Sequence, residues 1–329
     1  MNNWQVVSQR ASPLMWTSAG AVSLVLLIMV LSQVDWSLFI EILLGTLPAF
    51  VVLSIALFLL EGVFTSLRFY LLTPGDRGLA ACFSLTAWYV VLLILLPLRL
   101  GEVVVVLLLK KYLDQDASPA LMNVLVQRLF DLVTLCVVFL ACMLFFSSIF
   151  ESTQLKLLAL LCLLGLSWVL TRLDKIIALP AWFLSRHGVP KAGKFRVLLR
   201  TLLQARTWYR HRLTLPRSSV ALVLSLGKWL CNLLAFVFLL QALQLPVDFS
   251  SSLVIAAAYN FLTIVPVQTI GGIGLSEVGL SGLLVFSGLP LVLAASATIL
   301  VRVVVIMIPF LFWVLVMSVT RFSQAQVYE

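Results

Sequence analysis

Continuous apolar runs of about 20 residues recur along this chain and limit what it can fold into. Leu14 to Leu31 is one such run, and the largely apolar stretch from Ile42 to Tyr70 is another. Because the apolar residues are continuous and do not alternate with polar ones, each run suits a membrane-crossing helix and not a barrel strand. Hydrophobic residues make up 62% of the chain and charged residues 11%, against roughly 45–50% and about 25% in soluble domains. The sequence therefore predicts an all-α polytopic membrane protein, with residues 1–329 in a single membrane domain.

The net charge of +9 is concentrated in one segment between apolar runs. Arg172 to Arg217 contains no acidic residue after Asp174, so the positive-inside rule places it in the cytoplasm, next to anionic lipids. This position argues against nucleic acid as a partner. Within residues 174–217, apolar side chains recur at the 3.6-residue helical period and predict an amphipathic helix on the inner membrane surface. These side chains are Phe195, Leu198, Leu199, Leu202 and Leu203.

The region after the second run is expected to enter the membrane and turn back. Leu79 to Leu96 is long enough to cross, but Pro97 to Glu102 then leads through a short apolar stretch into Lys110 and Lys111. The positive-inside rule requires both lysines in the cytoplasm, and about a dozen residues are too few to cross back as a helix. The sequence therefore predicts a re-entrant helical hairpin that enters from the cytoplasm and turns at Pro97 to Glu102.

A second re-entrant hairpin, entered from outside, is expected from Phe249 to Val265 and Leu280 to Pro290. Six crossing helices complete the arrangement, about Leu14 to Leu31, Ile42 to Tyr70, Ala120 to Ile149, Leu155 to Leu170, Ser219 to Leu243 and Leu293 to Val319. This topology places both termini in the cytoplasm. We expect an integral protein of a bacterial inner membrane.

The two hairpin turns carry similar motifs. Pro97 to Glu102 has the sequence PLRLGE, and Pro266 to Glu277 has the sequence PVQTIGGIGLSE. Arg128 follows the first Glu by 26 residues, and Arg302 follows the second by 25, after the similar stretches ALMNVLVQR and AASATILVR. The spacing indicates one unit used twice.

These two units face opposite ways in the predicted topology. Residues 42–149 and residues 219–319 each contain a crossing helix, a hairpin and a crossing helix with an Arg. Many secondary transporters use such an inverted repeat to place a site near the membrane midplane, between discontinuous helices. The candidate substrate-binding residues are Arg99, Glu102, Arg128, Asp131, Gly271, Gly272, Gly274, Glu277 and Arg302.

Two interpretations remain open for the charged candidates. A carboxylate at membrane depth is energetically costly, so Glu102 and Glu277 need a role that explains it. In the functional interpretation, each is a protonatable gate or a partner for a headgroup cation. In the structural interpretation, each is a helix cap or a salt bridge that holds its hairpin closed. Arg99, Arg128 and Arg302 are expected to converge at the hairpin tips, where guanidinium groups can hold a phosphate by two hydrogen bonds. Alternatively, Arg128 pairs with Asp131 on its own helix and Arg302 pairs with Glu277.

Other polar residues have simpler interpretations. Glu61 and Arg68 are seven residues apart on one helical face, and we favour interfacial anchoring or mutual pairing over substrate contact. Gly271, Gly272 and Gly274 either present backbone N–H groups to an anion or permit a tight turn.

No pattern in the sequence indicates a metal or a cofactor. The chain has two histidines, and its five cysteines lie in apolar runs without CxxC spacing. The glycine-rich turn is not followed by the GKS or GKT of a Walker loop. We therefore expect no cofactor.

At PLRLGE followed by QRLFD, and at GGIGLSE followed by VR, the chain resembles the flippase-like membrane region of the lysylphosphatidylglycerol synthases. The resemblance covers about Leu14 to Val319. It implies movement of a lipid between leaflets, namely an aminoacylated phosphatidylglycerol or, in relatives, a polyprenyl-phosphate-linked sugar or a hopanoid. The family's characteristic residues fall on Pro97, Arg99, Gly101, Glu102, Arg128, Asp131, Gly271, Gly272, Gly274, Glu277 and Arg302.

Two departures from the family pattern matter. The synthases carry a soluble aminoacyl-transferring domain after the membrane region, whereas this chain stops at Glu329, so we expect that it does not make the lipid. Ser276 stands where the family commonly has a basic residue before the second Glu, so it is open how closely the substrate follows the family's.

The preferred hypothesis is a lipid translocase for an anionic or aminoacylated phospholipid, or for a polyprenyl-phosphate-linked lipid. The alternative is a non-transporting accessory subunit that binds a lipid- or glycan-modifying enzyme through the basic segment. A membrane-embedded enzyme is the weakest hypothesis, because no nucleophile with a base is visible. We expect no enzymatic activity, and the sequence sets no oligomeric state.

Overall fold

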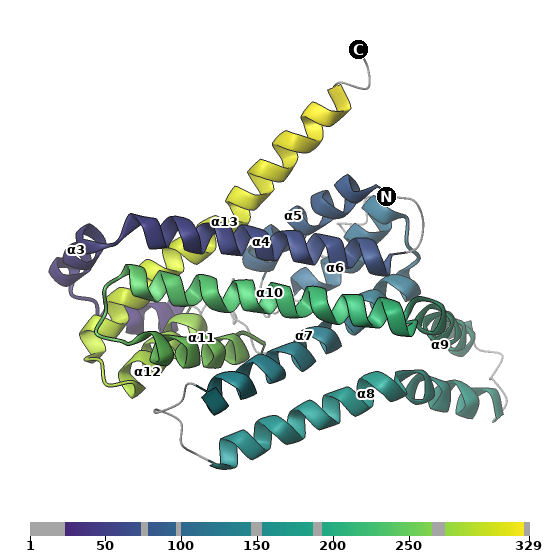
Figure 1. The fold of residues 1–329 in the computed structure, drawn as a ribbon. Coiled ribbons are helices and arrows are strands. Elements are labelled where there is room, and N and C mark those ends of the chain that lie inside the picture. Colours follow the sequence, from purple (N-terminus) through teal and green to yellow (C-terminus); the bar gives the residue numbers. More distant parts are fainter. Residues whose placement is uncertain are drawn as a thin grey trace.

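The computed structural model describes residues 24–73, 78–96, 100–145, 153–186, 193–264 and 274–325, which form helices and no strand (Figure 1). After a helix at Leu24–Leu31, the chain forms α3 (Trp36–Gly45), α4 (Pro48–Leu72), α5 (Leu79–Leu95), α6 (Leu100–Leu113), α7 (Ala117–Phe145), α8 (Thr153–Arg186), α9 (Gly193–Arg212), α10 (Leu215–Ala242), α11 (Phe249–Ile264), α12 (Leu275–Phe286) and α13 (Leu291–Ala325). The predicted all-α architecture is confirmed for these ranges.

Four helices in the described ranges are long and apolar enough to cross a membrane: α4, α7, α10 and the Leu291–Thr320 part of α13. They coincide with four of the six expected crossings. For the first expected crossing, the structure describes Leu24–Leu31, which is bent by 82° against α3, and the two can count together as a fifth span. The crossing expected at Leu155 to Leu170 lies within α8, where the apolar part is Leu160–Leu173. The count of six stays a prediction.

Two expected helix boundaries are wrong. The run from Ile42 to Tyr70 is not one helix, because α3 ends at Gly45 and α4 begins at Pro48. A proline fits the first turn of a helix, where its missing N–H is not needed, and it disfavours helical geometry in the residue before it. The basic segment was expected to follow a separate crossing, but α8 continues without a break to Arg186.

Helices α4 and α10 lie side by side and run antiparallel (Figure 1). At one end of this pair, the Leu47 N–H donates to the Ala242 carbonyl oxygen at 2.9 Å. Two turns further along α4, the Ser54 hydroxyl donates to the Ala235 carbonyl oxygen at 2.7 Å. Small polar residues bring membrane helices close together in this way. One helix comes from each predicted repeat, so this pair joins the two halves of the chain.

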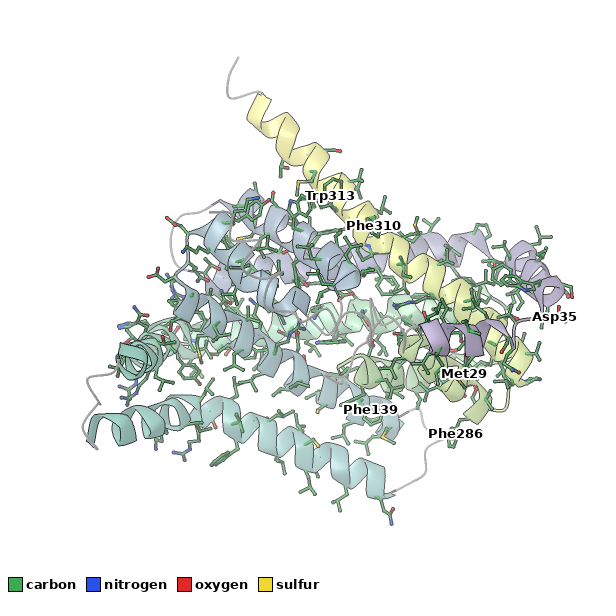
Figure 2. All side chains as sticks on the ribbon, turned by 180° about the vertical axis from the view of Figure 1, so that it is seen from behind. Met29, Asp35, Phe139, Phe286, Phe310 and Trp313 are labelled. Carbon is green, nitrogen blue, oxygen red and sulfur yellow. The ribbon has the colours of Figure 1, made fainter. Side chains whose placement is uncertain are left out.

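Helix α13 runs across the bundle, and its C-terminal part extends beyond the other helices (Figures 1 and 2). Its Trp313 ring packs edge to face on Trp88 of α5, with centroids 5.3 Å apart. Its Phe312 ring lies against Gly62 of α4, where a Cβ atom would be 2.6 Å from the ring. The glycine therefore allows the close contact between α4 and α13.

Each predicted hairpin is a pair of short helices that pack against each other, α5 with α6 and α11 with α12. The turn residues 97–99 and 265–273 lie outside the described residues. The breaks in the helices fall where the two motifs are, as the sequence predicted. Re-entry into a membrane stays a prediction for both pairs.

The basic helix α9 packs against α7 and α8. The Ser118 hydroxyl at the start of α7 donates to the Thr201 carbonyl oxygen at 2.7 Å, and Trp208 is buried. Leu203, one of the apolar residues expected to face the membrane, is 47% exposed. The helix thus sits at the end of the bundle where α6 ends and α7 begins.

Candidate functional site

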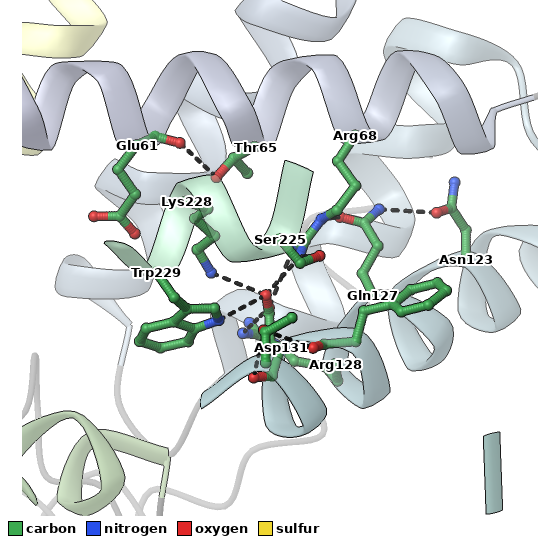
Figure 3. A network of polar contacts seen from close by, with 12 residues as sticks. Glu61, Thr65, Arg68, Asn123, Gln127, Arg128, Asp131, Ser225, Lys228 and Trp229 are labelled. Atoms are coloured by element: carbon green, nitrogen blue, oxygen red, sulfur yellow. Dashed lines mark hydrogen bonds and ion pairs between the residues drawn. The ribbon is translucent and has the colours of Figure 1, made fainter. Parts of the chain in front are cut away.

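A buried polar cluster lies between α4, α7 and α10 (Figure 3). Asn123, Gln127 and Asp131 are four residues apart in sequence, so they line one face of α7. All three are buried in otherwise apolar helices. A polar group at such a depth needs a partner, and each of these three has one on α4 or on its own helix.

Asp131 is the centre of the cluster. Its carboxylate receives two hydrogen bonds from Arg68 of α4, from Nη1 to Oδ1 at 2.5 Å and from Nη2 to Oδ2 at 3.2 Å. From α10, Lys228 Nζ lies 3.3 Å from Oδ1 and the Trp229 indole N–H donates to the same oxygen at 3.1 Å. Arg128 Nη1 is 3.7 Å from Oδ2. One carboxylate thus faces three cations, and Arg68 is its principal partner.

The remaining donors and acceptors of the cluster form a chain toward the end of α4. Arg68 donates through Nε to Gln127 Oε1 at 3.1 Å and through Nη1 to Ser225 Oγ at 2.8 Å. Gln127 donates to Asn123 Oδ1 at 2.8 Å, and Asn123 donates to Thr73 Oγ1 at 3.2 Å. These bonds fix the Arg68 guanidinium group in place, because most of its N–H groups are already used.

A cavity of about 130 Å³ adjoins the cluster. Its walls come from α4, α5, α6, α7 and α10, and its charged lining residues are Glu61, Arg68, Arg128, Asp131 and Lys228. This volume is well above the roughly 10–15 Å³ that a single water needs. The cavity therefore has room for a small polar group.

Two charged residues at the cavity are less enclosed than Asp131. The Arg128 side chain is 30% exposed and donates to the Tyr89 hydroxyl of α5. The Glu61 carboxylate accepts a hydrogen bond from the Asn232 amide at 2.8 Å. Arg128 and Lys228 can together hold an anion such as a phosphate, because charge-assisted hydrogen bonds from such cations are short and strong.

A second, tighter cluster joins α12 and α13. Arg302 Nε lies 2.9 Å from Glu277 Oε1, and the other oxygen of Glu277 accepts the Gly274 N–H at 2.5 Å. The pairing of Arg302 with Glu277, the alternative to phosphate binding in the sequence analysis, is present. Gly274 precedes α12 with φ = 90°, a left-handed conformation that favours glycine, so it serves the tight turn. The space beside this pair is too small for a water molecule.

The predicted site residues fall into two groups. Arg128 and Asp131 belong to the first cluster, whereas Gly274, Glu277 and Arg302 belong to the second. Arg99, Gly271 and Gly272 lie outside the described residues, as does the side chain of Glu102, which is in the first turn of α6. In the described part of the chain, Arg128 lines the charged cavity, whereas Arg302 lies at the narrow space beside Glu277. Their predicted convergence is therefore not shown, and a substrate role for either group stays a prediction.

The interpretation of Arg68 was wrong. It is neither an interfacial anchor nor the partner of Glu61, because it is 3% exposed and pairs with Asp131. The pairing of Arg128 with Asp131, expected to satisfy Asp131, is the longer contact at 3.7 Å. Lys228 and Trp229 were missed as members of the site. A lone charged residue in the apolar run of α10 is a signal for Lys228, but its partner is more than 90 residues away in sequence.

A family model described as the lysylphosphatidylglycerol synthase TM region matches residues 16–312. The match spans both polar clusters. Searches of curated proteins and of solved structures found no match.

Proposed function

We propose that this chain, which belongs to the family of the lysylphosphatidylglycerol synthase TM region, is a translocase that moves a lipid headgroup across the membrane. The observation that carries the proposal is the charged cavity between α4, α5, α6, α7 and α10. A lipid changes leaflets slowly because its polar headgroup must enter hydrocarbon. A cavity with buried partners for that headgroup lowers this cost. The lipid is an anionic or aminoacylated phospholipid or a polyprenyl-phosphate-linked lipid, and the protein carries it without altering it.

An apolar groove on the other face of α4 supports this function. It has a volume of about 560 Å³ and is lined by apolar side chains of α4, α5 and α13, such as Leu60, Phe83 and Val316. Glu61, which lines the charged cavity, is next to Leu60 in sequence. A lipid with its headgroup in the cavity would have an apolar surface for its tails on the same helix.

The pairing of helices supports a two-part mechanism. In our proposal, α5 with α6 and α11 with α12 are re-entrant hairpins, and the two halves form an inverted repeat. The antiparallel contact of α4 with α10 supports this relation, since one helix comes from each half. Arg128 and Arg302 then occupy equivalent positions, after the first and second hairpin.

The bond between Ser118 and Thr201 supports the proposed orientation. It brings the end of α6, with Lys110 and Lys111, close to the basic helix α9. Both belong in the cytoplasm by the positive-inside rule. We propose an inner-membrane location on this basis.

Leaflet exchange in proteoliposomes tests the proposal. Purified protein should accelerate the loss of a fluorescent phosphatidylglycerol from the inner leaflet, measured with a membrane-impermeant quencher. Arg128→Gln should slow this exchange by roughly tenfold or more, because one cation at the cavity is lost. Arg217→Gln, an exposed residue in the first turn of α10, is the matched control and should exchange lipid like the unaltered protein.

Two results would count against a translocase. Exchange no faster than in protein-free liposomes for every lipid class named above would overturn the proposal. If such a protein still bound lipid, the accessory-subunit alternative would be favoured. Equal exchange rates for Arg128→Gln and the unaltered protein would remove the cavity from the lipid path.

A further inference from the structure

We infer that the charged cavity selects a lipid headgroup with a net negative charge, of the phosphodiester class, over a zwitterionic or a cationic aminoacylated headgroup. The inference rests on the proposed function and names the substrate class of the same cavity. It separates this chain from the cationic lipid in the name of its family.

The charge balance of the cavity lining is the first argument. Arg68, Arg128 and Lys228 contribute three positive charges, and Glu61 and Asp131 contribute two negative ones, so the described lining carries a net charge of +1. A phosphodiester with one negative charge neutralises this sum. A lysyl-phosphatidylglycerol headgroup has two ammonium groups and one phosphate, so it would raise the total to two positive charges in a medium of low dielectric constant.

The hydrogen bonds of Asp131 are the second argument. An aminoacylated headgroup needs carboxylates for its ammonium groups, but both oxygens of Asp131 are held by Arg68, and Trp229 donates to one of them. Glu61 is the other carboxylate at the cavity, and Asn232 already donates to it. Two ammonium groups would therefore compete for one carboxylate.

The cations Lys228 and Arg128, unlike the two carboxylates, are the groups that would contact an anionic headgroup. Lys228 Nζ is 3.3 Å from Asp131 and 4.5 Å from the centre of the Trp229 ring, and the Arg128 side chain, 3.7 Å from Asp131, is 30% exposed. Both side chains line the cavity, so a phosphate there would face two cations at once. The cavity therefore provides more favourable electrostatic contacts for an anion than for an ammonium group.

The experiment measures lipid binding by native mass spectrometry of the full chain in detergent. The probes are phosphatidylglycerol, phosphatidylethanolamine and lysyl-phosphatidylglycerol with identical acyl chains, which carry one negative, zero and one positive net charge. We expect binding to weaken in that order. Each unit of charge should change the affinity by roughly tenfold to a hundredfold, as expected for unit charges a few ångströms apart in a partly buried site.

Two single-residue variants change the cavity charge in opposite directions. Glu61→Gln keeps an oxygen for the Asn232 amide and raises the net charge by one, so it should bind phosphatidylglycerol more tightly and discriminate more strongly against lysyl-phosphatidylglycerol. Lys228→Gln lowers the net charge by one and should reduce the discrimination by roughly tenfold or more. Lys111→Gln removes an exposed lysine at the end of α6 and is the control for a general loss of positive charge. It should leave the order of the three lipids unchanged.

The outcomes separate this inference from the proposed function. Binding of lysyl-phosphatidylglycerol equal to or tighter than that of phosphatidylglycerol would overturn the inference and leave translocation standing. A shift of discrimination in the same direction by Glu61→Gln and Lys228→Gln would also overturn it. Failure of all three lipids to bind would also overturn the inference, whereas the proposed function is decided separately by leaflet exchange in proteoliposomes.

Discussion

Asp131 is the residue on which the first cluster depends, because it is the shared counter-ion of side chains from three helices. Arg68 comes from α4 and Lys228 from α10, and both residues are buried. A buried ion pair adds little net stability when it is intact, since desolvation opposes the attraction. Removing one partner is costly, because it leaves a buried charge without compensation.

Asp131→Asn should therefore strongly destabilise the protein, by about 3–5 kcal/mol. The variant leaves Arg68 and Lys228 buried with no carboxylate between them. The measurement is the unfolding transition in detergent, followed by circular dichroism during titration with dodecyl sulfate. The control is Asp114→Asn, the same chemical change at an exposed residue with φ = 52°, a conformation that asparagine tolerates. Similar transitions for the two variants would refute the role given to Asp131.

At the scale of the helices, close contact between α4 and its neighbours depends on small residues. Gly62 lies under the Phe312 ring of α13, and Gly227 of α10 lies under the Phe64 ring of α4. In lipid, association of helices relies on packing and hydrogen bonds, since the tails outside are as apolar as the helix surfaces. The absence of a side chain at Gly62 therefore contributes to the packing of α4, as its charged residues do.

Gly62→Ala should destabilise the protein by about 1–3 kcal/mol, because the new Cβ would lie 2.6 Å from the Phe312 ring and the ring would have to move. Gly165→Ala in α8 is the matched control, as no atom lies within 4 Å of its added Cβ. That variant should be neutral or slightly more stable, because alanine favours a helix. The same detergent unfolding assay measures both.

Replacing the Phe312 ring tests whether the clash with this ring causes the loss of stability in Gly62→Ala. The double variant Gly62→Ala with Phe312→Leu should recover part of the lost stability, since a flexible leucine can avoid the new methyl group. No recovery, or an equal loss in Gly165→Ala, would show that the contact between α4 and α13 does not limit stability.

At the scale of the whole molecule, the bundle has two distinct ends. At one end, α4 begins and α10 finishes, joined by the bond from Leu47 to Ala242. At the other end, α6 finishes, α7 begins and α9 packs beside them, joined by the bond from Ser118 to Thr201. The second end carries the basic helix α9.

Cysteine labelling tests the assignment of these ends to membrane sides. In a variant without the five native cysteines, Lys111→Cys and Arg217→Cys should react with an impermeant maleimide from the same side. Pro246→Cys, in the loop after α10, should react from the opposite side. Intact cells and inverted vesicles distinguish the two sides. Labelling of Lys111→Cys and Arg217→Cys on different sides would contradict the orientation.

The sequence predicted the two breaks between the paired short helices, because the signals for them are local. Pro97 to Glu102 and the glycines before Glu277 mark ends of helices, and the breaks fall there. The pairing of Glu277 with Arg302 was one of the two interpretations that the sequence left open, and the structure shows it. The partners of Asp131 could not be predicted from the sequence, because Arg68 is 63 residues away and Lys228 is 97 residues away. Only the packing of α4, α7 and α10 brings these residues together.

The long contact between α4 and α10 also restricts how the molecule can change shape. The bond from Leu47 to Ala242 lies near one end, and the bond from Arg68 to Ser225 lies near the other. Sliding one helix past its neighbour by a single turn, about 5.4 Å, would break both bonds. Rotation of the other helices about the α4–α10 pair would preserve both hydrogen bonds. For the proposed translocase, we therefore expect any alternation between inward-open and outward-open shapes to be a rocking motion about this helix pair.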